Sequence, residues 1–182
     1  MALSALQERV AALVAALPES ADFVLAGGAV MAAHDMLDRA TRDLDYFARP
    51  DDAAAVQQFA DAFEDAAKRA GLEVRRKRQA ETFVRFAVRD GDEDCEVDVG
   101  IDYRALDSMP TRYGPALDLR ELGADKVLAI FGRAEPRDFV DLAELTRRVR
   151  ESLRLLQFVW RDGSELRCRW AFSWSRLRGE RT

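Results

Sequence analysis

Residues 23–47, FVLAGGAVMAAHDMLDRATRDLDYF, constrain the fold of this chain more than any other part of it. Apolar runs and chain breakers predict a strand (23–26), a Gly27-Gly28 turn, a helix (29–37) and a second strand containing Asp43-Leu44-Asp45. Side chains two positions apart in a strand point to the same face, so the carboxylates of Asp43 and Asp45 repel each other. Because aspartate is also depleted in strands, we predict that a cation lies between them.

The chemistry of this stretch suits a metal-bound phosphate. Mg²⁺ in proteins binds one or two carboxylates and fills its remaining positions with water and substrate phosphate oxygens. Gly27 and Gly28 have no Cβ atom, so their backbone can come close to a ligand, and the amides that open the following helix suit an anionic phosphate. The sequence therefore predicts a phosphate-binding turn beside a metal site.

Gly27-Gly28, followed after fourteen residues by Asp43-x-Asp45, resembles the signature of the nucleotidyltransferase superfamily. The resemblance is greatest to the AbiEii/AbiGii type, toxin components of bacterial toxin–antitoxin and phage-abortive systems. It covers roughly residues 25–145 and implies an α/β fold: a small mixed, twisted sheet flanked by helices, with a C-terminal helical extension. The implied reaction is Mg²⁺-dependent transfer of a nucleoside monophosphate from an NTP to a hydroxyl group, with Asp43 and Asp45 as metal ligands and Gly27 and Gly28 at the triphosphate.

A predicted hairpin supplies the third carboxylate. Residues 82–89 and 94–102 have strand patterns, and the D-G step in the loop between them is typical of hairpins. In the second strand one face carries Glu96, Asp98 and Asp102, which could simply be exposed. The superfamily places a third carboxylate beside the DxD strand, so the resemblance implies that Asp98 binds the metal and activates or orients the attacking hydroxyl, with Asp102 as second choice and Glu96 as third.

Residues 121–145 carry the remaining part of the resemblance. Gly132 and Pro136 predict two helices, 121–131 and 136–150. The family shows a comparable lysine, an arginine and an R-D-x-x-D motif, which correspond to Lys126, Arg133, Arg137, Asp138 and Asp141. The resemblance implies that Lys126 is catalytic and neutralises phosphate charge, and that Arg133, Arg137 and Asp138 help to bind the nucleotide. In the architectural alternative, Arg137 and Asp141 form an ordinary helical pair and Asp138 serves the helix N-terminus.

Two further helices and a basic run complete the first part of the chain. A capping box at Ser4 and Gln7 opens an amphipathic N-terminal helix, and a second helix is predicted from about residue 53 to residue 70. The run Arg75-Arg76-Lys77-Arg78 suits a solvated strand end or loop, with binding of a polynucleotide or triphosphate as the alternative.

The composition changes near residue 147, so we predict a catalytic domain (1–146) and a basic extension (147–182). The extension holds ten arginines, four acidic residues and all three tryptophans, a net charge of +6, whereas the rest of the chain carries −11. Three interpretations remain open: the extension stacks on single-stranded nucleic acid, docks a partner, or is an altered form of the family's helical C-terminal region.

The expected partners are an NTP, a tRNA or protein acceptor and a cognate antitoxin. No apolar run reaches membrane-spanning length, and two cysteines and one histidine predict neither a disulfide framework nor a zinc site, so we expect a cytoplasmic protein that binds no membrane. Two alternatives are a catalytically silent binding protein on the same scaffold and a small-molecule transferase of the antibiotic-modifying type.

Overall fold

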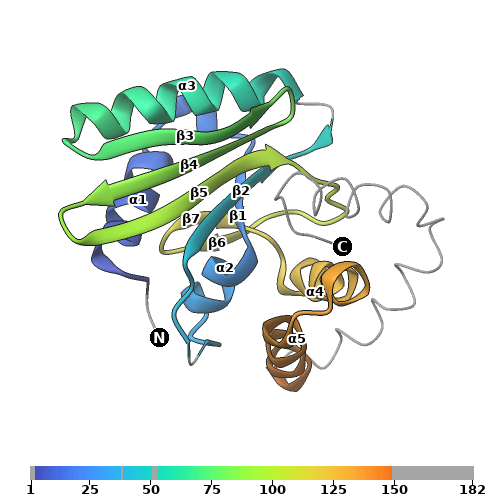
Figure 1. Ribbon diagram of the computed structural model, residues 1–182. Helices are drawn as coiled ribbons and strands as arrows, with labels where there is room; N and C mark the ends of the chain where they lie inside the picture. Colours follow the sequence, from blue (N-terminus) through green and yellow to red (C-terminus); the bar gives the residue numbers. More distant parts are fainter. Residues whose placement is uncertain (1–2, 38, 51–52, 149–182) are drawn as a thin grey trace. The chain divides into compact units, whose positions relative to one another are not determined.

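The computed structural model describes residues 3–37, 39–50 and 53–148 (Figure 1). They fall into two compact units. The sheet unit contains the described residues up to Asp102 together with Ser108–Leu117, and the helical unit contains Tyr103–Asp107 together with the described residues from Asp118 to Arg148. Almost all of the basic extension lies outside the described residues, so its boundary at residue 146 and its role stay predictions.

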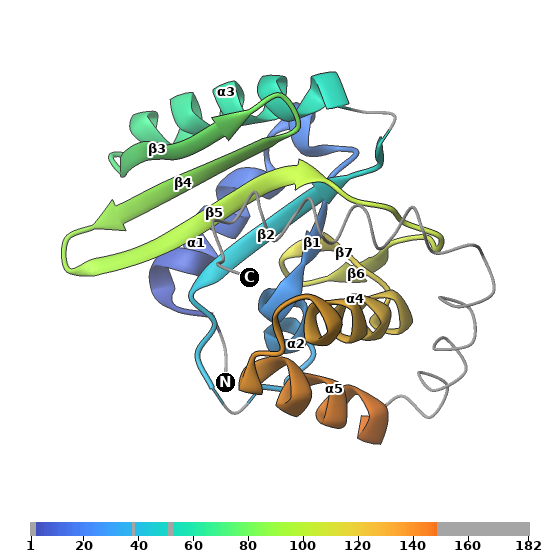
Figure 2. The same ribbon diagram turned by 45° about the vertical axis from the view of Figure 1, so that its right-hand side comes forward.

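A seven-stranded twisted sheet forms the sheet unit, in the order β3-β4-β5-β2-β1-β7-β6 (Figures 1 and 2). Its strands are β1 (Val24–Ala26), β2 (Asp43–Ala48), β3 (Glu73–Ala80), β4 (Phe83–Asp90), β5 (Glu93–Ile101), β6 (Met109–Thr111) and β7 (Gly114–Ala116). The β2–β5 and β1–β7 pairs are parallel, and all other neighbouring pairs are antiparallel. The predicted α/β fold with a small mixed sheet is therefore confirmed.

Two helices, α1 (Ala5–Ala15) and α3 (Ala53–Arg69), contact each other and pack against the sheet. The capping box at Ser4 and Gln7 opens α1, as predicted. In α3 the helical spacing of Phe59 and Phe63 places both rings in the core, where Phe59 packs against Phe23 in a tilted arrangement with 4.6 Å between ring centroids. The apolar face of β5 completes this core with Cys95, Val97 and Val99, all buried.

Several element boundaries differ from the sequence prediction. The helix after β1, α2 (Gly27–Ala33), begins at Gly27, so the two glycines form its first turn. The basic run lies inside β3, an edge strand that pairs with β4, and the β6–β7 hairpin had no counterpart among the predicted strands.

Two packed helices, α4 (Leu119–Arg133) and α5 (Pro136–Arg148), make up most of the described helical unit. Gly132 lies inside α4, which ends at Ala134 in a left-handed conformation (φ 51°). The start of α5 at Pro136 agrees with the prediction. Among the described residues, no helix combines the length and the apolar character that crossing a bilayer requires.

Candidate functional site

Two buried carboxylates lie directly opposite each other in the middle of the sheet. The parallel β2–β5 pairing makes Asp45 and Asp98 Cα partners, and Asp43 lies opposite Glu96. Side chains of directly opposite residues in neighbouring strands share a face. Only 3% of Asp45 and 1% of Asp98 are exposed, so two like charges lie close together and out of water.

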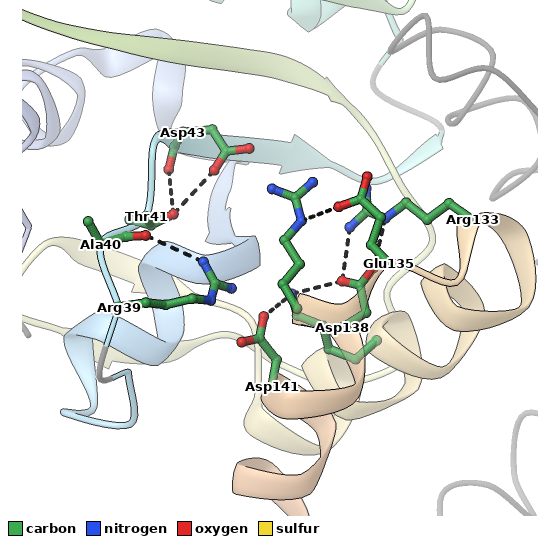
Figure 3. Close-up of polar contacts among 10 residues, drawn as sticks. Arg39, Ala40, Thr41, Asp43, Arg133, Glu135, Asp138 and Asp141 are labelled. Atoms are coloured by element: carbon green, nitrogen blue, oxygen red, sulfur yellow. Dashed lines mark hydrogen bonds and ion pairs between the residues drawn. The ribbon is translucent and has the colours of Figure 1, made fainter.

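The start of α2 lies against this carboxylate pair. Gly27 has a φ of +63°, and a Cβ atom built on it would lie 2.0 Å from Oδ2 of Asp45. At Gly28 a Cβ atom would lie 2.7 Å from Oγ1 of Thr41. Thr41 Oγ1 in turn donates a hydrogen bond to Oδ1 of Asp43, at 3.2 Å (Figure 3). Both glycines therefore sit where a side chain would collide with the acidic strand or with the residue that orients it.

Arg85 of β4 binds the buried carboxylate from the other side. Its Nε donates to Oδ1 of Asp98 at 2.7 Å and its Nη2 to Oδ2 at 2.8 Å, which is a bidentate ion pair. Its Nη1 lies 3.6 Å from Oε2 of Glu96. Sequence reasoning missed Arg85, although the signal was present: counting back from the two-residue loop between β4 and β5 pairs Arg85 with Asp98.

The other acidic residues of this region occupy different positions. Glu96 shares the face of Asp98 and is half-buried. Asp102 lies beyond the end of β5, where its backbone N–H donates to the carbonyl of Ala48 at 2.8 Å. Of the three candidates for the third ligand, only Asp98 lies directly opposite the DxD strand residue Asp45.

The donor set of Asp43, Asp45 and Asp98 suits a hard divalent ion, because carboxylate oxygens are the ligands that Mg²⁺ prefers. Over residues 3–37, 39–50 and 53–148, no three His, Cys, Asp or Glu side chains are already gathered in a metal-binding arrangement. In this structure Arg85 contacts both oxygens of Asp98, and Thr41 contacts Asp43. Each carboxylate oxygen has a second lone pair, so these contacts leave acceptor capacity for an ion.

A second charged cluster lies within the helical unit (Figure 3). Lys126 Nζ lies 2.6 Å from Oδ2 of Asp141 and 3.4 Å from Oδ1 of Asp138, and Arg133 forms a bidentate pair with Asp138 at 2.8 and 2.9 Å. Both aspartates are fully buried, and Lys126 is 7% exposed. Within this cluster two cations therefore balance two anions.

The electrostatics of Asp138 follow from these contacts. Burial alone would raise the pKa of its carboxyl group, but the hydrogen bonds and charge of Arg133, with a smaller contribution from Lys126, outweigh it and hold the pKa below its ordinary value of 3.8. Asp138 lies in the first turn of α5, as the architectural alternative expected. In place of the Arg137–Asp141 pair of that alternative, Arg137 Nε lies 2.6 Å from Oε2 of Glu135, and Asp141 binds Lys126.

Known structures share this fold. JHP933 from Helicobacter pylori is 17% identical, with a TM-score of 0.59 over 83% of this chain and 70% of that one. MenT4, a nucleotidyltransferase toxin from Mycobacterium tuberculosis H37Rv, is 22% identical, with a TM-score of 0.61 over 79% of this chain and 57% of that one. No curated protein matches the chain. At these identities the similarities show a common fold.

The sequence also matches a protein family. The sequence model described as "Nucleotidyl transferase AbiEii toxin, Type IV TA system" matches residues 11–162, which is most of the chain. The match includes the glycines, the carboxylate pair and the helical cluster. The chain therefore belongs to the AbiEii nucleotidyltransferase toxin family of type IV toxin–antitoxin systems.

Proposed function

We propose that this nucleotidyltransferase toxin transfers a nucleoside monophosphate from an NTP to a hydroxyl group of a tRNA or protein, in a Mg²⁺-dependent reaction. The observation that carries this proposal is the direct opposition of Asp45 and Asp98 on adjacent parallel strands, with Gly27 against Asp45. Two buried carboxylates in this position weaken the fold unless cations balance them, which is typical of a site built for function.

The predicted site residues would divide into metal ligands and phosphate-binding residues. Asp43, Asp45 and Asp98 would hold the ion, which supplies charge neutralisation at the triphosphate. Gly27 and Gly28 leave room for the triphosphate beside the acidic strand. Lys126 would neutralise phosphate charge, and Arg133, Arg137 and Asp138 would belong to the same nucleotide-binding set.

The proposed step is a single displacement at phosphorus. The acceptor oxygen forms a bond to the α-phosphorus, the bond from that phosphorus to the bridging oxygen of the β-phosphate breaks, and pyrophosphate leaves. The acceptor proton passes to the carboxylate of Asp98, which also orients the hydroxyl group. Positioning and charge neutralisation supply most of the rate enhancement in such reactions.

The buried cluster in the helical unit limits the role of Lys126. Its ammonium group is already balanced by Asp138 and Asp141, and its side chain is 9% exposed. Contact with phosphate therefore requires Lys126 to share or leave these carboxylates. We propose that the cluster holds Lys126 in one orientation, which lowers the entropy cost of binding a phosphate.

Incubation of the purified chain with Mg²⁺ and each of the four α-labelled NTPs, with and without total tRNA, tests the proposal. We expect label on tRNA or on protein, none in EDTA, and none with Asp45→Asn. Label on neither macromolecule, but on a small hydroxylated compound added in a parallel reaction, would support the antibiotic-modifying type. NTP binding without any transfer would support the silent binding protein, the alternative favoured by the engagement of both Asp98 oxygens by Arg85.

A cognate antitoxin is the remaining partner of this proposal, since the family is defined by toxin–antitoxin systems. Its expression should relieve growth inhibition caused by this chain. Transfer by the purified chain alone, without the antitoxin, is the expected baseline.

A further inference from the structure

We propose that Arg85 is a positioning residue for nucleotidyl transfer: it aims the carboxylate of Asp98 and provides the positive charge beside it when no metal ion is bound. This inference rests on the proposed function, because it takes Asp98 as a ligand and proton acceptor. The observation behind it is the bidentate Arg85–Asp98 pair, whose arginine side chain is 17% exposed and whose aspartate side chain is 1% exposed.

The pair does not serve to hold the two strands together. β4 and β5 are neighbours in a continuous antiparallel ladder that runs from Asp90 opposite Glu93 to Phe83 opposite Gly100. Their backbone hydrogen bonds and a two-residue loop already fix their register. The Arg85–Asp98 pair therefore fixes the orientation of the Asp98 carboxylate and balances its charge.

Arg76 shows the contrasting, structural use of the same residue type. It lies on β3, and its guanidinium reaches two carboxylates of α3, Asp61 and Glu64, at 2.6 Å each. These pairs join a helix to the sheet. Both guanidiniums lie over an aromatic ring, that of Arg76 5.5 Å from the centroid of Phe86 and that of Arg85 5.9 Å from the centroid of Phe83. The Arg76 side chain is 22% exposed, close to the value for Arg85, so it provides a matched control.

The charge balance at Asp98 depends on its neighbours in the sheet. Asp45 lies directly opposite it on β2, and Arg85 lies directly opposite it on β4. The charges of Arg85, Asp98 and Asp45 alone sum to −1, which attracts a divalent ion. Removal of the guanidinium charge makes the row more negative, so the metal-free fold should lose stability and the attraction for a metal ion should grow.

The geometry of the guanidinium also matters. Two parallel N–H groups bind the two oxygens of Asp98, whereas a lysine ammonium is a single point donor and cannot fix the plane of a carboxylate. Outer-shell partners of this kind orient metal ligands, and their loss typically lowers activity by ~10–100-fold. Arg85→Lys therefore separates charge from orientation.

The test combines melting curves, Mn²⁺ binding and kinetics for wild type, Arg85→Gln, Arg85→Lys and Arg76→Gln. In EDTA we expect Arg85→Gln to melt lower than wild type, and Mn²⁺ to raise its Tm more than that of wild type. Calorimetry without nucleotide should show Mn²⁺ binding on the order of tenfold tighter, since a neighbouring positive charge is gone. The turnover number kcat should nevertheless fall about 10–100-fold, with KM for NTP nearly unchanged.

Three control comparisons keep the outcome interpretable. Arg85→Lys should recover the Tm of the metal-free protein and leave kcat low, because it restores charge without orientation. Arg76→Gln should lower Tm with no change in the metal response or in Mn²⁺ affinity. In an Asp98→Asn background, Arg85→Gln should lose its effect on the metal response.

An equal response of wild type and Arg85→Gln to Mn²⁺, or an unchanged kcat, would overturn the inference. Failure of the proposed function gives a different result, namely a wild-type chain that transfers no nucleotide although the metal response still depends on Arg85. If wild type transfers nucleotide and Arg85→Gln behaves like Arg76→Gln, the proposed function stands and Arg85 is structural.

Discussion

Gly27 leaves room for Asp45: a Cβ atom on the glycine would lie 2.0 Å from Oδ2 of the aspartate. Any side chain at position 27 must therefore displace one of the two buried carboxylates. The positive φ of Gly27 adds a backbone penalty for every other residue type. Both the space beside Asp45 and the backbone conformation therefore require glycine at position 27.

Gly27→Ala should lower the free energy of unfolding and abolish transfer. We expect a loss of about 1–3 kcal/mol from the left-handed conformation and the displaced carboxylate. Urea denaturation measures this, with Gly132→Ala as the control, because a Cβ atom there meets nothing within 4 Å and α4 should gain about 0.5–1 kcal/mol. Equal stability of Gly27→Ala and wild type would contradict the close approach of Gly27 to Asp45.

Asp43→Asn and Asp45→Asn should each abolish transfer while the fold stays intact or becomes slightly more stable. Asparagine keeps the shape of aspartate and removes one of two repelling charges. Labelled-NTP transfer and thermal melts of the same preparations check both parts. An unfolded or fully active variant would show that the metal-site interpretation is wrong.

Lys126→Met should destabilise the helical unit. The substitution leaves Asp138 and Asp141 buried with one cation fewer, and breaking a buried pair costs about 3–5 kcal/mol. The double variant Lys126→Met with Asp141→Leu should recover most of this loss, since the charge and its partner leave together. Lost transfer with unchanged stability would instead show that Lys126 acts on phosphate alone.

The contribution of Asp138 to stability should disappear at low pH. Because the pKa of Asp138 is lower in the folded chain than its ordinary value of 3.8, the folded state binds the proton less well than the unfolded state. The contribution is therefore complete above about pH 3.8 and is lost as the pH falls through the lower, folded value. Urea denaturation between pH 3 and 7 measures the difference in unfolding free energy between wild type and Asp138→Asn, which should narrow below about pH 3.8. A difference that stays constant or widens there would disprove the lowered pKa of Asp138.

Tyr46→Phe should stabilise the sheet unit or leave it unchanged. The hydroxyl group of Tyr46 is buried and finds no hydrogen-bond partner in the described part of the chain, and burial raises its pKa. Removing an unpaired buried hydroxyl should gain about 1 kcal/mol. Tyr113→Phe is the matched control: the Tyr113 hydroxyl donates to Oε1 of Glu8 at 2.9 Å, so this variant should be less stable than wild type. A destabilised Tyr46→Phe would reveal a partner for the Tyr46 hydroxyl.

The sequence predicted a strand and its polar face correctly where hydrophobic periodicity and the positions of charged residues agree. In β2 the two aspartates alternate with Leu44 and Tyr46, so the period of two predicted both the strand and its acidic face. The same alternation on β5 separated Asp98 from Val97 and Val99, and the parallel β2–β5 pairing then brought Asp98 opposite Asp45. The local alternation of residues therefore predicted which face of the strand carries Asp98, whereas only the fold determined that Asp45 lies opposite it.

Other elements were missed for physical reasons. The residues of β6 and β7 include Pro110, Gly114 and Pro115, which local rules assign to loops, and pairing with β1 overrides those rules. The basic run concealed β3, because the partners of Arg76, Asp61 and Glu64 of α3, are distant in sequence and are brought close only by the fold. Gly132 did not end α4, because one glycine costs a helix only about 1 kcal/mol, which packing can offset.

The hairpin between β4 and β5 also sets an order of events for a newly made chain. Arg85 and Asp98 become neighbours across a two-residue loop. Asp45 and Asp98 are separated in sequence by α3, β3 and β4, although their strands are neighbours in the sheet. Contacts between residues near in sequence form sooner than distant ones. Asp98 should therefore pair with Arg85 when the hairpin forms, before β5 pairs with β2. The charge of Asp98 is then already balanced by Arg85 when Asp45 becomes its neighbour.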